Sequence, residues 1–163
     1  MTETMRAIVL IGIPGSGKTT YIQNELSNVP NPFTVCPDDI RVELAGDAAD
    51  QTMNHEVWLQ AYQRAEEALQ GGNVLIFDAT NAKRLDRVVL LDHLRSVMGP
   101  EGFIKGIWVK TPLEVCMKRN ANRGRTVPEV AVERMYHQLE AEPPRLYEGF
   151  NQLYVPDFEP SLA

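Results

Sequence analysis

The sequence feature that constrains this chain most is "GIPGSGKTT", Gly12 to Thr20, which follows directly after the apolar run "AIVLI", Ala7 to Ile11. A short apolar run that ends at a Pro-Gly pair is typical of a buried strand. Glycines let the backbone curl so that successive N–H groups point at one anion, and a following helix directs the positive end of its dipole there. The stretch therefore predicts a strand, a phosphate-binding turn and a helix, in that order.

The same stretch fits the full pattern G-x-x-x-x-G-K-[ST] from Gly12 to Thr19. We expect Lys18 to reach the β- and γ-phosphates of a nucleoside triphosphate, and the Thr19 hydroxyl to ligate Mg²⁺. The alternative, a glycine turn that binds nothing, is disfavoured because all eight positions match between a predicted strand and a predicted helix. The nucleotide-binding residues predicted in the turn are Gly12, Pro14, Gly15, Ser16, Gly17, Lys18, Thr19 and Thr20.

The rest of the chain alternates between strand and helix patterns. Apolar runs predict further strands at about 33–36, 73–80, 103–109 and 151–155, and helical spacing predicts helices at about 18–27, 38–46, 52–70, 85–98, 112–122 and 128–140. On the helix at 85–98, the residues expected to face the core are Val88, Leu91, Leu94 and Met98. Such alternation predicts one α/β domain over 1–163, a three-layer sandwich with a mostly parallel sheet of about five strands. Ligands of such sheets bind at the carboxyl ends of the strands.

Composition sets the broad class. At 163 residues the chain is long enough for one buried core, and no run approaches the ~18 apolar residues of a membrane span. The first residues, "MTETMR", lack the features of a secretory signal, and Cys36 and Cys116 form no close pair that would indicate zinc or a disulfide framework. We therefore expect a cytoplasmic protein without a membrane partner, and the oligomeric state stays open.

The net charge of −6 argues at first against a nucleic-acid partner. The segment from Lys83 to Arg125, however, holds ten Lys or Arg and four acidic residues, so it carries +6 while the remainder carries −12. Such asymmetry can focus an anionic substrate on one face of an acidic protein. Two unlike, solvated helix faces would explain the distribution equally well.

Carboxylates at two predicted strand ends suggest group transfer, which needs an aligned nucleophile, an orienting carboxylate and neutralising cations. "PDDIR" places Asp38 and Arg41 three residues apart, so Asp38 could take a proton from an alcohol while Arg41 orients that carboxylate. The alternative for Asp38 is a helix N-cap, although Asp39 suits that position better. Asp78 ends an apolar strand, where it could hold Mg²⁺, orient the acceptor or cap the next helix.

Basic residues gather near the end of the helix predicted at 112–122. Arg119 and Arg123 are four apart and share one face, and Arg125 follows soon after. They could close over ATP as a lid that stabilises developing charge and excludes water, although a solvated basic face is the alternative for Arg125. No N-K-x-D stretch that would bind guanine occurs, and "DATN" lacks the glutamate that a motor ATPase would carry beside its acid. A small phosphotransferase remains.

Four stretches occur in this order along the chain: "GIPGSGKTT", "CPDDIR", "FDATN" and "KRNANRGRTVP". In these stretches, and over about residues 8–155, the chain resembles the 5′-hydroxyl polynucleotide kinases of phage and bacterial nucleic-acid repair. The resemblance implies a P-loop kinase fold with a helical lid, and ATP and Mg²⁺ as cofactors. It implies that Asp38 is the general base on the 5′-OH, that Arg41 contacts Asp38 and the acceptor's phosphate, and that Asp78 is an essential acid. The residues that it implies for binding ATP and its metal are Lys18, Thr19, Arg119 and Arg123.

We therefore expect an ATP-dependent kinase for the 5′-OH ends of DNA or RNA, with its acceptor groove in the basic segment. The residues expected near the acceptor are Asp38, Arg41, Asp78, Lys83, Arg84 and Arg87, of which the last three could instead form a solvated first helical turn. Related P-loop kinases phosphorylate other alcohols, so a hydroxymethylated DNA base, a nucleotide or a small molecule is an alternative acceptor. A non-catalytic, nucleotide-binding regulatory module is a further alternative.

Overall fold

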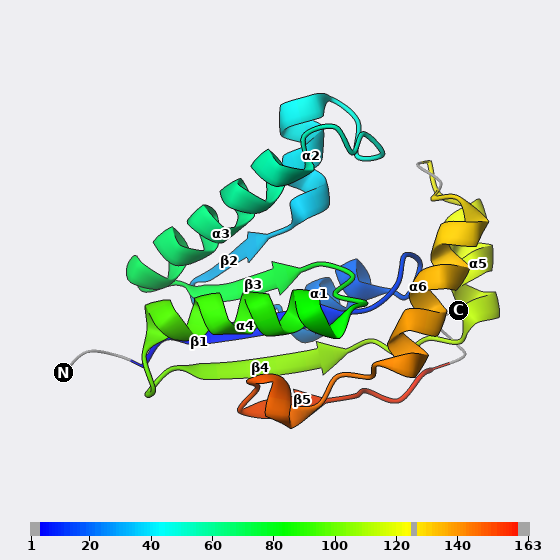
Figure 1. Ribbon diagram of the computed structural model, residues 1–163. Helices are drawn as coiled ribbons and strands as arrows, with labels where there is room; N and C mark the ends of the chain where they lie inside the picture. The colour runs from blue at the N-terminus through cyan, green and yellow to red at the C-terminus, as the bar shows by residue number, and fades with distance from the viewer. Residues whose placement is uncertain (1–3, 125–126, 160–163) are drawn as a thin grey trace.

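The structure is a computed structural model that describes residues 4–124 and 127–159 of the 163-residue chain. Strands and helices alternate along the chain as the sequence predicts (Figure 1). The elements are β1 (Arg6–Ile11), α1 (Lys18–Glu25), β2 (Pro32–Val35), α2 (Pro37–Ala45), α3 (Asn54–Gln70), β3 (Val74–Asp78), α4 (Arg84–Met98), β4 (Phe103–Trp108), α5 (Leu113–Ala121), α6 (Glu129–Ala141), the 3-10 turn η1 (Leu146–Glu148) and β5 (Gln152–Tyr154).

The five strands form one parallel sheet in the order β2-β3-β1-β4-β5, which confirms the predicted α/β class. The central strand β1 pairs with β3 on one side, where Leu10 lies opposite Asp78, and with β4 on the other. The chain leaves β1 toward β2 at one edge of the sheet, whereas it leaves β3 toward β4 in the other direction. Connections that diverge in this way open a crevice at the carboxyl ends of the two strands. The phosphate-binding turn and Asp78 lie at those ends.

Both faces of the sheet are covered, because alternate residues of each strand enter different cores. On β1, Val9 and Ile11 join the larger core, which also takes buried residues from α3, α4, α5 and α6. Ile8 and Leu10 join a smaller core on the opposite face, against partly buried residues of α1. The result is the three-layer sandwich that the sequence predicts.

The inner face of α4 differs from the prediction in one respect. Leu91, Leu94 and Met98 are buried as predicted, whereas Val88 is half-buried. Arg87, on the same face, is fully buried at 0% exposure. Apolar spacing could not predict a buried arginine, because its burial depends on partners far along the chain.

Helices flank the carboxyl edge of the sheet on two sides. Figure 1 shows α2 beyond the end of β2, and α5 with α6 beyond the end of β4, while the chain after β5 runs toward the same edge. This arrangement surrounds the end of β1 with segments from all parts of the sequence. Among the described helices, none is both long and apolar enough to span a bilayer.

Candidate nucleotide and acceptor site

The phosphate-binding turn between β1 and α1 has a backbone shape that requires glycine. Gly15 and Gly17 have φ values of +83° and +98°, in the left-handed region that other residues rarely adopt. A Cβ at Gly15 would also clash with the carbonyl oxygen of Cys116 on α5. The Thr111 hydroxyl strengthens this contact by donating to the carbonyl oxygen of Ser16 at 2.6 Å. The turn is therefore shaped by α5 as well as by its own glycines.

Two polar groups of the turn are suited to an anion. The Lys18 Nζ donates to the carbonyl oxygen of Gly12 at 2.7 Å, so this side chain folds back over the turn. Burial lowers the pKa of Lys18, and the carboxylates of Asp78 and Asp38 oppose that shift. The Ser16 hydroxyl is buried and has no hydrogen-bond partner among the described residues. Because a buried donor without a partner is costly, a phosphate bound in the turn would relieve it.

A cavity of about 800 Å³ opens at the turn, at the carboxyl edge of the sheet. This volume lies within the range of about 300–1,000 Å³ that small-molecule sites occupy. The predicted residues that line it are Pro14, Gly15, Ser16, Gly17, Lys18, Thr19, Thr20, Asp38, Asp78, Arg119 and Arg123. The structure thus brings most of the predicted site together in one place.

Asp38 and Arg41 form the ion pair expected from their spacing. Arg41 Nη1 donates to Asp38 Oδ1, and Nη2 donates to Asn54 Oδ1 on α3, both at 2.7 Å. Arg41 is 6% exposed and is held between two helices, whereas the Asp38 side chain is 52% exposed at the cavity wall. The N-cap residue of α2 is Cys36, and no side chain makes a capping hydrogen bond there. The alternative that Asp38 or Asp39 caps this helix is therefore wrong.

Asp78 ends β3 at the cavity wall. Burial raises the pKa of its carboxyl, and the positive charge of Lys18 opposes the rise. The alternative role as a helix cap is wrong, because α4 begins at Arg84 with Lys83 as its N-cap residue and without a side-chain cap. Asp78 is thus a partly buried carboxylate that faces the phosphate-binding turn.

The cavity wall also offers donors that fit Mg²⁺. Asp78, which has a carboxylate, and Thr19, which has a hydroxyl, both line the cavity. Mg²⁺ in phosphate-transfer sites takes one or two carboxylates together with substrate phosphates and several waters. Over residues 4–124 and 127–159, no group of three or more His, Cys, Asp and Glu forms a metal site by itself. The oxygen donors present therefore suit a metal that arrives with a nucleotide.

The two arginines predicted to bind ATP both line the cavity. Arg119, on α5, donates from Nη1 to the carbonyl oxygen of Gly15 at 3.2 Å, which ties this helix to the turn. Arg123 is exposed in the turn after α5, and its charge contributes to the lowered pKa of Lys18. Arg123 and Lys18 therefore lie within electrostatic reach of one another. Arg125, the third arginine of the predicted lid, lies outside the described residues.

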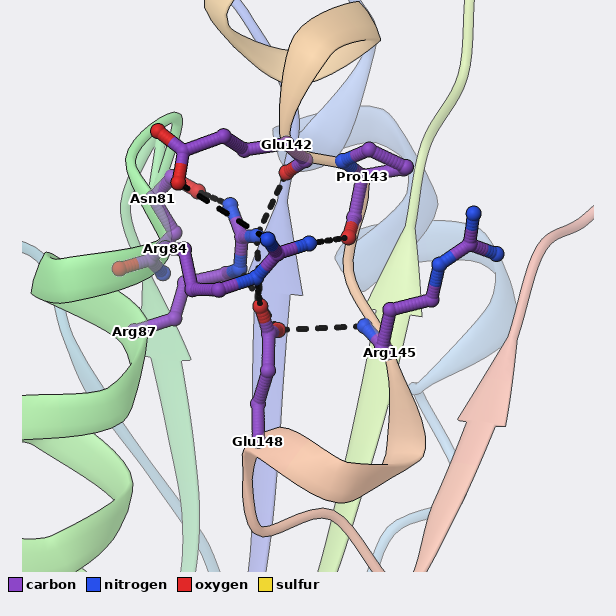
Figure 2. Close-up of polar contacts among 7 residues, drawn as sticks. All are labelled: Asn81, Arg84, Arg87, Glu142, Pro143, Arg145 and Glu148. Carbon is purple, nitrogen blue, oxygen red and sulfur yellow. Dashed lines mark hydrogen bonds and ion pairs between the residues drawn. The ribbon is translucent and has the colours of Figure 1, made fainter.

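The structure contradicts the predicted acceptor contacts of Arg84 and Arg87. Figure 2 shows both side chains converging on Glu148. Arg87 is enclosed and donates to Glu148 and to the carbonyl oxygens of Asn81 and Glu142. Arg84 donates to Glu148 from Nε at 2.8 Å and to the Pro143 carbonyl oxygen at 3.0 Å.

The physical reason lies in Glu148, which stands 61 residues beyond Arg87 and so could not be paired with it from local spacing. Neither Arg84 nor Arg87 lines the cavity. Lys83 is exposed at the start of α4 and is also absent from the cavity wall. The basic groove predicted from the segment 83–125 therefore does not form around α4 as expected.

Sequence analysis missed the contribution of the segment after β5. Tyr154, the last residue of β5, and Pro156, Asp157, Phe158 and Glu159 after it line the cavity. A usable signal was present, because any segment that follows a parallel strand starts at the carboxyl edge where ligands bind. The aromatic residues in this short segment give it apolar surface to contribute to the site.

A phosphate-binding turn, a carboxylate at the end of the neighbouring strand and a parallel sheet of this order together define a P-loop kinase fold. The family model of an AAA domain, AAA_33, matches residues 8–142. This chain belongs to that family.

Solved structures share this fold at low sequence identity. A chain of the Pnkp1/Rnl/Hen1 RNA repair complex aligns with a TM-score of 0.71 at 23% identity, covering 86% of this chain and 46% of that one. A candidate kinase from Chloroflexus aurantiacus aligns with a TM-score of 0.65 at 20% identity, covering 95% and 89%. These likenesses concern the fold, and this chain spans about half the length of the RNA repair protein.

One curated protein matches by sequence. The "Transcription factor bHLH140" of Arabidopsis thaliana is 26% identical over 156 residues, which are 90% of this chain. The chain spans 15% of the length of that plant protein. The matched region is therefore one part of a much longer protein.

Proposed function

We propose that this protein transfers the γ-phosphoryl group of ATP to a hydroxyl acceptor, and that the acceptor is the 5′-OH end of DNA or RNA. The observation that carries the proposal is that one cavity is lined both by the phosphate-binding turn and by Asp38, whose carboxylate Arg41 holds at 2.7 Å. A turn that binds phosphates needs no such carboxylate for binding alone. A reaction that removes a proton from an alcohol does need one.

In the proposed reaction the acceptor oxygen forms a bond to the γ-phosphorus while the bond from that phosphorus to the β,γ-bridging oxygen breaks. Asp38 accepts the hydroxyl proton, and Arg41, fixed by Asn54, keeps the carboxylate in position. Lys18 exchanges its hydrogen bond to Gly12 for the β- and γ-phosphates. ADP is the leaving group.

Asp78 and Thr19 would hold Mg²⁺, which would supply positive charge that neutralises the charge developing on the phosphates. Arg119 and Arg123 would add positive charge on the same wall of the cavity. The protein's own part is to orient the two substrates and to exclude water between them.

The nucleic-acid acceptor is supported by the combination of "PDDIR" with "KRNANR" and by the shared fold with a chain of an RNA repair complex. A small alcohol is a second candidate, and a specific observation favours it. Arg84 and Arg87, which we expected near a nucleic-acid acceptor, instead form hydrogen bonds with Glu148. Asp38 and Asp39 at the cavity wall also oppose a long anionic strand there.

An end-labelling assay with γ-labelled ATP separates these candidates. Matched DNA and RNA oligonucleotides, each with a 5′-OH or a 5′-phosphate, are offered beside free nucleosides and small alcohols. We expect label only on 5′-OH oligonucleotides, and none with Lys18→Ala. Label on small alcohols but on no oligonucleotide would replace the proposed acceptor. ATP binding without label on any hydroxyl would refute phosphoryl transfer and favour a regulatory module.

A further inference from the structure

A buried ion pair between Arg87 and Glu148, two residues that do not line the cavity, is not explained by the proposed chemistry (Figure 2). The side chains of Arg87 and Glu148 are both 0% exposed. Arg87 Nε donates to Glu148 Oε1 at 2.9 Å, and its Nη2 donates to Oε2 at 2.8 Å, a two-point contact with fixed geometry. Arg84 adds a third hydrogen bond to the same carboxylate. These arginines hold the pKa of Glu148 below its ordinary value although burial alone would raise it.

One hydrogen bond of Arg87 reaches the loop after Asp78. Nη1 donates to the carbonyl oxygen of Asn81 at 2.9 Å, and Asn81 has a left-handed φ of 51°. The Asn81 side chain in turn donates to the carbonyl oxygen of Leu10 at 2.9 Å, one residue before the end of β1. The Gly12 amide donates to the Thr80 carbonyl oxygen at 3.1 Å. The loop that follows Asp78 is therefore fixed to the phosphate-binding turn on one side and to Arg87 on the other.

The remaining hydrogen bonds reach the end of α6. Arg87 Nη2 donates to the Glu142 carbonyl oxygen at 2.6 Å, and Arg84 Nη2 donates to that of Pro143 at 3.0 Å. Glu142 is the C-cap residue of α6, where helical carbonyl groups lack partners inside the helix. Two arginines there also complement the negative end of the helix dipole. The end of α6 is thus anchored to the first turn of α4.

The other end of α6 leads back to the cavity. Asn120 is 1% exposed and bonds to Val127 twice, donating to its carbonyl oxygen at 2.6 Å and accepting from its amide at 3.1 Å. These two bonds join the end of α5 to the start of α6 and fix where Arg123 emerges between them. We call α5, α6 and residues 122–124 and 127–128 the arm. Arg119 ties the arm to the turn, and Arg87 ties it to the loop after Asp78.

We propose that Arg87 is a positioning residue that couples the arm, and hence Arg123, to the loop that follows Asp78. This inference rests on the proposed phosphoryl transfer, which needs both groups placed on the same phosphates. A buried ion pair is weak evidence for stability, because the cost of removing two charges from water offsets their attraction. One rigid guanidinium that binds carbonyl oxygens on two separate elements is instead suited to setting the distance between those elements.

The test compares Arg87→Lys with Arg95→Lys. Arg95 lies on the same helix and also donates to carbonyl oxygens, those of Gly99 and Gly102, at the end of α4 that is remote from Arg87. Lysine keeps the charge but cannot bind three groups in a plane. We expect Arg87→Lys to lower kcat about 100-fold with the KM for ATP unchanged, since small misplacements of reacting groups have effects of that size. Arg95→Lys should behave as the wild type. Equal kcat in both variants would overturn the proposal.

Because Arg87→Lys could unfold the protein, Glu148→Gln serves as a second variant, in which the new side chain has a shape similar to that of glutamate. Thermal unfolding is measured for the wild type and for every variant. A double-mutant cycle separates positioning from general damage. If Arg87 acts through Arg123, Arg87→Lys should cause little further loss of kcat in an Arg123→Ala background. Fully multiplicative losses in that background would contradict the coupling.

Amide hydrogen exchange with a non-hydrolysable ATP analogue gives a readout that does not depend on the acceptor. We expect the analogue to protect both the turn at 12–20 and the arm in the wild type and in Arg95→Lys, but only the turn in Arg87→Lys. Protection of the arm in all three proteins would overturn the proposal. If the arm is protected only in proteins that keep Arg87, but the wild type labels no acceptor, the coupling is supported and only the proposed function is refuted.

Discussion

Replacing Gly15 by alanine tests how far nucleotide binding depends on the packing of the phosphate-binding turn against α5. Gly15 has a φ of +83°, and an added Cβ would clash with the carbonyl oxygen of Cys116. Gly46, which ends α2, has a φ of +77° and no atom within 4 Å of an added Cβ. Gly46→Ala therefore imposes similar left-handed strain without the clash, and it is the matched control.

The two substitutions should differ both in the size of their effects and in the property that they change. A residue with a Cβ in the left-handed region costs about 1–2 kcal/mol, so both variants should lose this much free energy of unfolding. In Gly15→Ala the clash is with backbone, which cannot rotate away as a side chain can, so the turn or α5 must shift. Loss of one charge-assisted hydrogen bond to a phosphate costs about 1.5–3 kcal/mol. That loss corresponds to ATP affinity about 10- to 150-fold weaker.

Titration calorimetry with ATP and Mg²⁺ measures the affinity, and thermal unfolding measures the stability of each variant. We expect Gly46→Ala to bind ATP as the wild type does while it melts at a lower temperature. Gly15→Ala should lose both stability and affinity. If Gly15→Ala binds ATP as tightly as Gly46→Ala, the turn does not depend on its contact with Cys116, and the reasoning about this packing is wrong.

Three further predictions concern charged groups. Arg41→Ala should lower kcat more than it raises the KM for ATP, because it removes the Arg41 hydrogen bond that orients the Asp38 carboxylate without touching the turn, as steady-state kinetics will measure. Burial raises the pKa of Asp78, so the folded state binds its proton more tightly than the unfolded state and stability falls as pH rises above about 3.8. Asp78→Asn should therefore raise the melting temperature at pH 7 while abolishing turnover, and a lower melting temperature would contradict this. The pKa of Glu148 is lowered, so its contribution is present above its ordinary value of about 4.5 and is lost as pH falls below it. Glu148→Gln should show a weaker loss of stability in acid than the wild type in urea unfolding at pH 3 to 6.

Local patterns predicted the fold well, because the relevant physics is local. Buried parallel strands have apolar runs, and the pattern of Gly12 to Thr19 fixes a strand, a turn and a helix together. The Asp38–Arg41 ion pair was also predictable, since residues three apart on a helix lie on one face. Each of these predictions needs only a few neighbouring residues.

Features that depend on distant partners could not be predicted. The charge of Arg87 suggested an exposed phosphate contact, but Glu148 neutralises it inside the protein. Tyr154 and the segment after it carry no binding motif of their own, and they reach the cavity because β5 is a parallel strand whose carboxyl end lies at that edge of the sheet. In both cases the deciding information is how segments far apart in the sequence are placed relative to one another, which local spacing does not contain.

The most direct test of the central claim compares the wild type with Asp38→Asn. The rate of γ-phosphoryl transfer in a single turnover is measured at saturating ATP, with the acceptor that the wild type labels. If Asp38 removes the acceptor's proton, Asp38→Asn should bind ATP normally and transfer about 10²–10⁴-fold more slowly. Transfer by Asp38→Asn at the wild-type rate would contradict the account.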